Sequence, residues 1–459
     1  MTPQRAAMEY ADGLPAPQRR RAMLTIAIAL AMAVVGSAIA NVALPAMAHD
    51  LGARPAEAVW VVNAYQIAVL MTLLPFASLG DIHGLARVFG IGLAVFTAAS
   101  LACAMAPSMG ALIAARVVQG LGAAGMMSVN VALVRATFPA RMFGRGLGMN
   151  SLIVAASLAA GPSVAAAVLA VADWPWLFAL NLPFGLTALA MLRSLPQSPA
   201  SGHGFDLPSA VMSAATFGLF TTGLNGLSHG EAAPLVVLQF VATFGLGGMF
   251  VRRQLMLAQP MLPIQMFRRP VFALSVATSV CSFLAQTLAS VALPFGFIVM
   301  MGRSQAEAGL MMTAWPVAVA VVAPLSGWLS DRASAGLLGG IGLMVMTLGL
   351  ALLATMPADA SLAAVTWRMA LAGVGTALFQ SPNNRQMLSA IPREQSGAGS
   401  GILATARLLG QTGGAALVSL VFALTEAAGV GRGVLAALML AVGFGALGAV
   451  LSSLRLMRR

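Results

Sequence analysis

Lysine is absent from this sequence of 459 residues, and charged side chains of every kind are scarce. Charged residues make up 8% of the chain against 59% hydrophobic residues, and the mean hydropathy is +0.90. A soluble domain of this length has too little interior to bury so much apolar surface. The composition therefore excludes a soluble globular protein and predicts a polytopic membrane protein.

Cysteine is almost as rare, and no catalytic or nucleotide-binding pattern is present. Cys103 and Cys281 stand alone inside apolar runs, which predicts neither a disulfide framework nor a metal site. Without a lysine there is no phosphate-binding loop for ATP, and no nucleophile, base and acid follow one another in a recognisable order. We expect no enzyme activity, no cofactor and no metal.

Long apolar runs are what the chain has in abundance. A membrane-spanning helix needs about 20 mostly apolar residues, and about fourteen such runs follow one another. We therefore predict an all-α bundle of two pseudo-symmetric six-helix halves and two inserted helices. The predicted divisions are a cytoplasmic tail (1–21), an N-terminal half (22–193), a connector with two extra spans and a basic loop (194–270), and a C-terminal half (271–459).

The distribution of the arginines predicts how the bundle is oriented. If the N-terminus is cytoplasmic, 19 arginines lie in cytoplasmic segments and three, Arg54, Arg303 and Arg432, lie on the opposite side. Basic residues are enriched in the cytoplasmic loops of membrane proteins. The bias predicts a bacterial inner-membrane protein with both termini in the cytoplasm, and it explains the net charge of +12 without nucleic acid as a partner.

Two apolar runs are joined by a short polar hinge, Gly80-Asp81-Ile82-His83-Gly84-Leu85-Ala86-Arg87. Glycine permits a tight reversal, and a carboxylate or guanidinium at the headgroup level can pin neighbouring helix ends. A weaker copy of this hinge contains Asp331 and Arg332. The residues predicted to act in gating are Gly80, Asp81, Gly84, Arg87, Asp331 and Arg332. The alternative is that Asp81 only caps a helix and that Arg87 only follows the charge rule.

Glycine-rich runs are repeated as well. One run begins at Arg116, one span after the first hinge, and a similar run begins at Arg368, one span after the second. Small residues let membrane helices approach closely, and parallel half-repeats with a site between them are typical of transporters.

Several segments together resemble the major facilitator superfamily, and most closely its fourteen-span drug:proton antiporter branch of multidrug efflux proteins. The segments are Asn41-Val-Ala-Leu-Pro45, Trp60-Val-Val-Asn-Ala-Tyr65, the hinge from Gly80 to Arg87, Arg116-Val-Val-Gln-Gly120, Gly161-Pro162, and Ser381-Pro-Asn-Asn384 with Thr405-Ala-Arg407. They extend over nearly the whole chain.

The resemblance implies alternating access, in which two six-helix halves rock about a central cavity and export amphipathic compounds against protons. It implies that Asp81 and Arg87 hold the outward-facing state and that Gly161-Pro162 bends a helix that takes part in gating. One position departs from the family, because Gly36 stands where an acid is usual in helix 1. None of the 13 acids falls at mid-membrane, so an acid near an interface would have to carry the proton.

Polar side chains inside the spans are the candidates for substrate binding, namely Asn41, Asn63, Tyr65, Gln66, Gln119 and Trp315. Hydrogen bonding between helices is the alternative role for such residues. The candidates for proton or substrate coupling are Arg116, Asp81 and Arg407. For the two arginines, the alternative is a structural role in bonding backbone carbonyls.

We predict a secondary active transporter that works as a monomer in the lipid bilayer. Its predicted partners are protons and amphipathic small molecules such as drugs and toxic compounds, which it exports. One alternative is a carrier of the same superfamily for an anionic or neutral metabolite, without the usual proton coupling. Another is a sensor or scaffold that does not transport.

Overall fold

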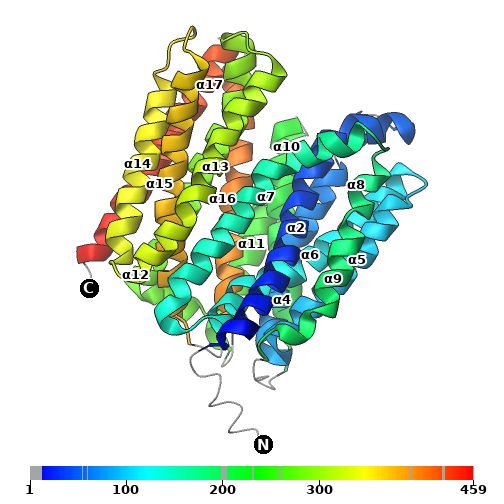
Figure 1. Cartoon of the computed structure of the whole chain (residues 1–459), viewed down its shortest axis with the longest axis vertical. Helices are drawn as coiled ribbons and strands as arrows, with labels where there is room; N and C mark the ends of the chain where they lie inside the picture. The colour runs from blue at the N-terminus through cyan, green and yellow to red at the C-terminus, as the bar shows by residue number, and fades with distance from the viewer. Residues whose placement is uncertain are drawn as a thin grey trace, which may run out of the picture.

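The computed structural model describes residues 13–53, 55–58, 60–197, 204–229, 232–257, 260–392, 395–425 and 429–457, and these residues are almost entirely helical (Figure 1). The helices are α2 (Ala16–Asp50), α3 (Pro55–Ala58), α4 (Trp60–His83), α5 (Leu85–Ala104), α6 (Met109–Thr137), α7 (Phe143–Leu169), α8 (Pro175–Ala179), α9 (Asn181–Ala190), α10 (Leu207–His229), α11 (Ala233–Met256), α12 (Pro270–Phe295), α13 (Gln305–Ser330), α14 (Ala335–Ala354), α15 (Leu362–Ser389), α16 (Ser396–Thr425) and α17 (Val430–Met457).

Eleven of the described helices are long and apolar enough to cross a membrane, and α7, which is bent, makes twelve. The pair α8–α9 and helix α16 pack in the same bundle but lie outside this count. A polytopic all-α membrane protein is therefore confirmed, whereas the number fourteen stays a prediction. Helix α2 begins at Ala16, inside the segment predicted as a tail, because Pro15 and Pro17 fix the backbone at its start.

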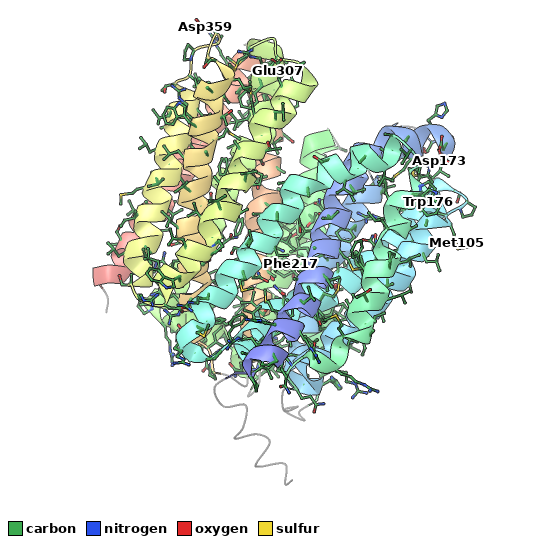
Figure 2. The ribbon with its side chains drawn as sticks, in the orientation of Figure 1. Met105, Asp173, Trp176, Phe217, Glu307 and Asp359 are labelled. Carbon is green, nitrogen blue, oxygen red and sulfur yellow. The ribbon has the colours of Figure 1, made fainter. Side chains whose placement is uncertain are left out.

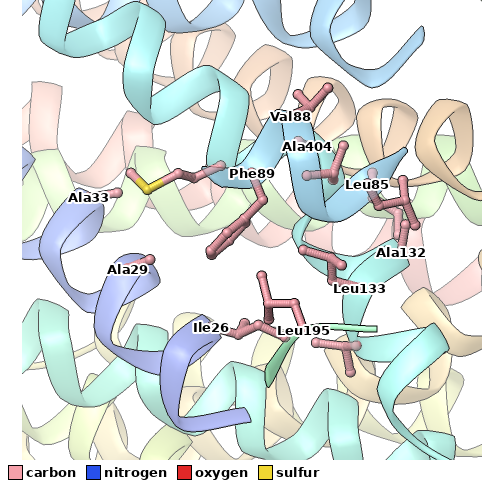
Figure 3. Packing of buried hydrophobic residues seen from close by; sticks show 14 of the residues in the cluster. Ile26, Ala29, Ala33, Leu85, Val88, Phe89, Ala132, Leu133, Leu195 and Ala404 are labelled. Carbon is pink, nitrogen blue, oxygen red and sulfur yellow. The ribbon is translucent and has the colours of Figure 1, made fainter. Parts of the chain in front are cut away.

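Helices α2–α9 and α12–α17 form two groups that lie side by side at one end of the molecule and diverge toward the other (Figure 1). We call the end at which α2 begins and α17 ends the termini face, and the opposite end the far face. Near the termini face a continuous apolar core joins the groups, since Phe89 and Leu133 of the first group share a cluster with Leu388 and Leu403 of the second. Figure 3 shows part of this packing, with Ala404 of α16 among residues of the first group.

Glycine residues allow the backbones of neighbouring helices to come into contact, and they do so at corresponding positions in the two groups. A Cβ atom on Gly120 of α6 would lie 2.6 Å from the carbonyl oxygen of Tyr65 in α4. A Cβ atom on Gly373 of α15 would lie 2.5 Å from the carbonyl oxygen of Trp315 in α13. The repeated glycine-rich runs thus mark the same helix contact in both groups.

The inserted helices α10 and α11 are fastened together at the termini face. Asp206, just before α10, accepts hydrogen bonds from Arg253 of α11 at 2.8 Å from Nη2 and 3.2 Å from Nε. Burial alone would raise the pKa of Asp206, but hydrogen bonds from Arg253 and Ser209 outweigh burial and hold this pKa below its usual value. Helix α10 packs on α4 and α16, so the inserted pair lies against both groups.

The glycine contacts predict a steric effect on stability. Gly122→Ala would place a Cβ atom 2.8 Å from the carbonyl oxygen of Gly92 in α5. We expect the midpoint of thermal unfolding in detergent to fall by about 3–6 °C, because overpacking destabilises a tightly packed interior. Gly248→Ala in α11 is the control, since nothing lies within 4 Å of its Cβ position. Equal midpoints for the two variants would contradict the role given to this contact.

Candidate functional site

A cavity of about 530 Å³ lies between the two groups and is lined by both. Of the residues predicted to bind substrate, it brings together Asn63, Tyr65 and Gln66 of α4, and it adds Arg407 of α16. The lining residues are Ala33, Val34, Ser37, Asn63, Tyr65, Gln66, Ile67, Val69, Met127, Val154, Leu158, Thr221, Leu224, Thr287, Ser290, Arg407, Leu408, Gln411, Thr412, Ala415, Ala416 and Ser419. Thr221 and Leu224 come from α10, so an inserted helix forms part of the wall.

Among the residues of α16 that line the cavity, Arg407 is the one nearest to the termini face. The helix begins at Ser396 on the termini face, so a rise of about 1.5 Å per residue places Arg407 roughly 16 Å along it. Gln411, Ala415 and Ser419 follow at intervals of four residues, which is the spacing of one helix face. The polar lining of α16 therefore extends from the middle of the bundle toward the far face.

The carboxylates that the structure describes lie near the ends of the bundle. Glu307, Asp359 and Asp173 lie at the far face (Figure 2), whereas Asp81 and Asp331 lie at the ends of α4 and α13 on the termini face. None of the described acids lines the cavity. At Gly36, where the family usually has an acid, a Cβ atom would lie 3.5 Å from the ring of Phe96. This position therefore faces a neighbouring helix and not open space.

Arg116 lies behind the cavity wall, fully buried in the first group. Its Nε donates a hydrogen bond of 2.9 Å to the carbonyl oxygen of Val61, and Nη1 donates to Gln119. The guanidinium carbon lies 4.3 Å from the ring centroid of Tyr65, which separates it from the cavity wall. Neither Arg116 nor Gln119 is among the lining residues, and these contacts favour the structural role for both.

Of the two remaining predicted binding residues, Trp315 is described and is not among the lining residues. Trp315 is half-buried and packs in the apolar core of the second group. The side chain of Asn41 lies outside the described part of the chain. The described binding candidates at the cavity are thus the α4 residues, and Arg407 is the coupling candidate that joins them.

The termini face is closed by a first contact, which we call the Asp81 latch. One carboxylate oxygen of Asp81 accepts a hydrogen bond of 2.7 Å from the backbone N–H of Gly397, and the other accepts one of 2.8 Å from Ala398. Gly397 and Ala398 lie in the first turn of α16, so an acid of the first group caps a helix of the second group. The free N–H groups and the dipole of a helix N-terminus make it a binding site for a carboxylate.

A second contact, the Asp331 latch, has the same form with the groups exchanged. The carboxylate of Asp331 accepts hydrogen bonds from the N–H groups of Gly144, at 2.8 Å, and Arg145, at 3.2 Å, at the start of α7. Arg385 of α15 lies 3.6 Å from the same carboxylate and donates to the carbonyl oxygen of Ser330. Each group therefore supplies one acid and one helix N-terminus.

A glycine pattern in the sequence marks the two helix starts that bind Asp81 and Asp331, and it lies outside the hinge motif. Glycine recurs at every second position at the start of α7, in 144–148, and at the start of α16, in 397–401. A Cβ atom on Gly397 would lie 2.5 Å from the carbonyl oxygen of Ala77 and 2.6 Å from Asp81 Oδ1. Only glycine lets the helix start come close enough for the carboxylate to reach its N–H groups.

A third contact across the termini face, which the hinge motif does not predict, is made by Arg135 at the end of α6. Its Nη1 donates to the carbonyl oxygens of Leu388, at 2.9 Å, and Ile391, at 3.1 Å, and to Ser396 Oγ at 3.1 Å. Carbonyl groups at the end of a helix lack intrahelical partners. Arg135 thus joins the first group to the turn between α15 and α16.

The other predicted gating residues lie in the two hinges, except for the Gly161-Pro162 pair, which lies further along α7. Gly84 has a φ of 98° and starts α5, which meets the need for glycine in the hinge, and a Cβ atom on Gly80 would clash with Val129. Arg87 is exposed, and the guanidinium carbon of Arg332 lies 3.8 Å from the ring centroid of Trp328. The helical stretch that begins at Ala140 and continues through α7 bends by 43° between residues 140–161 and 163–169, at the Gly161-Pro162 pair.

This architecture is that of a transporter in which two helix groups enclose a central cavity. The sequence profile of the Major Facilitator Superfamily matches residues 26–415, and the chain belongs to this family. It is 53% identical to the uncharacterized transporter YebQ of Escherichia coli K12 over 413 residues, which are 89% of this chain and 90% of that protein.

Other relatives agree with this assignment. The chain is 30% identical to the multidrug resistance protein Stp of Mycobacterium tuberculosis over 409 residues, which are 87% of this chain and 75% of that protein. The solved structure of the proton:xylose symporter XylE has a TM-score of 0.69 at 14% identity and covers 95% of both chains. The likeness to XylE shows a shared fold.

The latches predict a measurable shift between conformations. Replacing Asp81 or Asp331 by alanine removes two hydrogen bonds to a carboxylate, which weakens closure of the termini face. We expect a cysteine introduced at Met127→Cys in the cavity to react about tenfold faster with an impermeant maleimide added from the termini face. The parent without this cysteine measures the background from the buried Cys103 and Cys281.

Asp50→Ala is the matched control for this experiment, because it removes an exposed carboxylate at the other end of the bundle. It should leave the rate of labelling unchanged. Unchanged labelling in both Asp81→Ala and Asp331→Ala would show that these carboxylates do not keep the termini face closed.

Proposed function

We propose that this protein is a secondary active transporter that exports amphipathic small molecules across the bacterial inner membrane by alternating access, in exchange for protons. The observation that carries the proposal is a cavity between two helix groups that is closed at one end by two equivalent latches. Opening the termini face requires the release of both latches. Separation of the groups at one face and their closure at the other would then expose the cavity to each side in turn.

The direction of transport is proposed from charge and from the relatives. The excess of arginine at the termini face favours a cytoplasmic location for it, so the structure would represent the outward-facing state. Stp, by its name a multidrug resistance protein, is 30% identical to this chain and supports drugs or toxic compounds as substrates. On this proposal the protein belongs to the fourteen-span drug:proton antiporter branch and works as a monomer.

Proton coupling is proposed to act through the latches, because the described acids lie away from the cavity. An ionised carboxylate accepts hydrogen bonds from N–H groups more strongly than a protonated one. Protonation of Asp81 would weaken its bonds to Gly397 and Ala398 and favour opening of the termini face. Proton release after opening would restore the Asp81 carboxylate, which could again accept these hydrogen bonds and allow the face to close.

A second candidate function is that of a carrier for a metabolite without the usual proton coupling. The observation that favours it is that none of the described carboxylates lines the cavity, so substrate and proton do not share a site there. The two candidates differ in whether substrate movement is accompanied by proton movement.

Proton antiport is tested in everted membrane vesicles whose interior is acidified. We expect at least one compound from a panel of lipophilic cations, anions and neutral molecules to trigger proton release from vesicles that contain the wild type. Asp81→Asn should reduce this release by roughly tenfold, because an amide cannot take up and give off the proton. A fluorescent pH indicator inside the vesicles measures the release.

Asp50→Asn, which neutralises an exposed acid at the far end of α2, should retain wild-type proton release. Uptake of a compound without proton movement would replace antiport by the uncoupled carrier. If no compound moved although the purified protein were folded, the proposal of transport would fail.

A further inference from the structure

The cavity contains one kind of charge. Arg407 is the single charged side chain among the lining residues that the structure describes, and the other polar groups there are amides and hydroxyls. It is half-buried, and its buried Nε has no hydrogen-bond partner. A guanidinium in the interior of a membrane protein is costly unless it is paired or solvated.

A second arginine strengthens the positive potential from behind the wall. Arg116 is completely buried, its Nη2 has no hydrogen-bond partner, and the ring of Tyr65 separates it from the cavity. The partners that it has, Val61 and Gln119, are neutral. In a medium of low dielectric constant such uncompensated charges attract anions and repel cations over a longer range than in water.

The surroundings of Arg407 suit an acidic group. A planar guanidinium binds a carboxylate or sulfonate through two parallel hydrogen bonds. Gln411 lies one turn further along the same face of α16, and its amide can donate to the same ligand. The hydroxyl of Tyr65 already donates to the carbonyl oxygen of Ala33 at 3.2 Å, so the donors for an acidic group come from Arg407 and Gln411 rather than from Tyr65.

The rest of the wall suits an apolar body. Val34, Met127, Val154, Leu158 and Leu224 line the cavity from four different helices. Methionine and branched aliphatic side chains accept apolar ligands of varied shape. The cavity therefore combines one anion-binding position at mid-depth with an apolar surface around it.

We infer that the substrates are amphipathic organic anions whose carboxylate or sulfonate binds Arg407 while the apolar part lies against α2, α6, α7 and α10. This inference rests on the proposed function and specifies its substrate class. A bound anion neutralises the unpaired guanidinium, a neutral compound leaves it unpaired, and a cation is repelled by it. The protein thus selects against the lipophilic cations that an acidic cavity would favour.

Two dyes that share a xanthene body but differ in charge test the inference, namely fluorescein, an anion at pH 8, and rhodamine 123, a cation. Fluorescence anisotropy of each dye is titrated with the purified full-length protein in a neutral detergent. We expect fluorescein to bind at least tenfold more tightly than rhodamine 123. Arg407→Gln should weaken fluorescein binding by about 10- to 100-fold, Arg407→Lys should restore part of it, and Arg407→Glu should reverse the preference.

Arg432→Gln is the matched control, because it removes the same charge from an exposed position outside the cavity. It should bind fluorescein as the wild type does, and thermal unfolding of each variant shows whether the protein is folded. Absence of fluorescein binding, equal or stronger binding of rhodamine 123, or fluorescein binding unaffected by Arg407→Gln would each overturn the inference.

The same dyes separate this inference from the proposed function. In proteoliposomes, transport of rhodamine 123 in preference to fluorescein would overturn the anion selectivity and leave transport intact. Selective binding of fluorescein through Arg407 without any transport of it would support the anion site and contradict the proposed function.

Discussion

The structure depends on a carboxylate that binds the first N–H groups of a helix in the opposite group. Asp81 makes this contact with α16, and Asp331 makes it with α7. The contact is strong when the carboxylate is ionised, because a charged acceptor then meets N–H groups that have no partners within their own helix. It is also reversible, because water can hydrogen-bond to the carboxylate and to the N–H groups when the two separate. A contact with both properties can hold a conformation without making it permanent.

Three arginines in or near the spans have different environments, and their partners suggest different roles. Arg116 is bound by a backbone carbonyl, an amide and an aromatic ring, all within the first group. Arg455 is 1% exposed and donates to Asn383 at 2.7 Å and to Gln386 at 3.0 Å, which fastens α17 to α15. Arg407 has no such ligands and borders the cavity. An arginine whose hydrogen-bonding capacity is unfilled beside a cavity is suited to bind a ligand.

Much of the fold could be predicted from sequence because long apolar runs have one stable form in a bilayer. The hinge around Asp81, its copy at Asp331 and the glycine-rich runs inside α6 and α15 are local patterns, and the helices and much of their packing follow from them. The partners of the acids could not be predicted from the hinge, since Gly397 is far from Asp81 in the chain.

The cavity was predicted in part: Asn63, Tyr65 and Gln66 line it, but Gln119 and Trp315 pack elsewhere. Arg455 is one of the 19 arginines that the count assigns to cytoplasmic segments, but its side chain is buried.

The sequence by itself determined that this chain is a helical membrane protein, where most of its spans lie and that its two halves repeat a hinge. Hydropathy and glycine spacing decide these properties, and they act between residues that are close in the chain. Only the tertiary structure decided which polar groups meet. It places the carboxylate of Asp81 at the start of α16, Arg116 inside the first group and Arg407 beside the cavity. These pairings depend on how each helix is rotated and on how the two groups pack, and no local pattern specifies either.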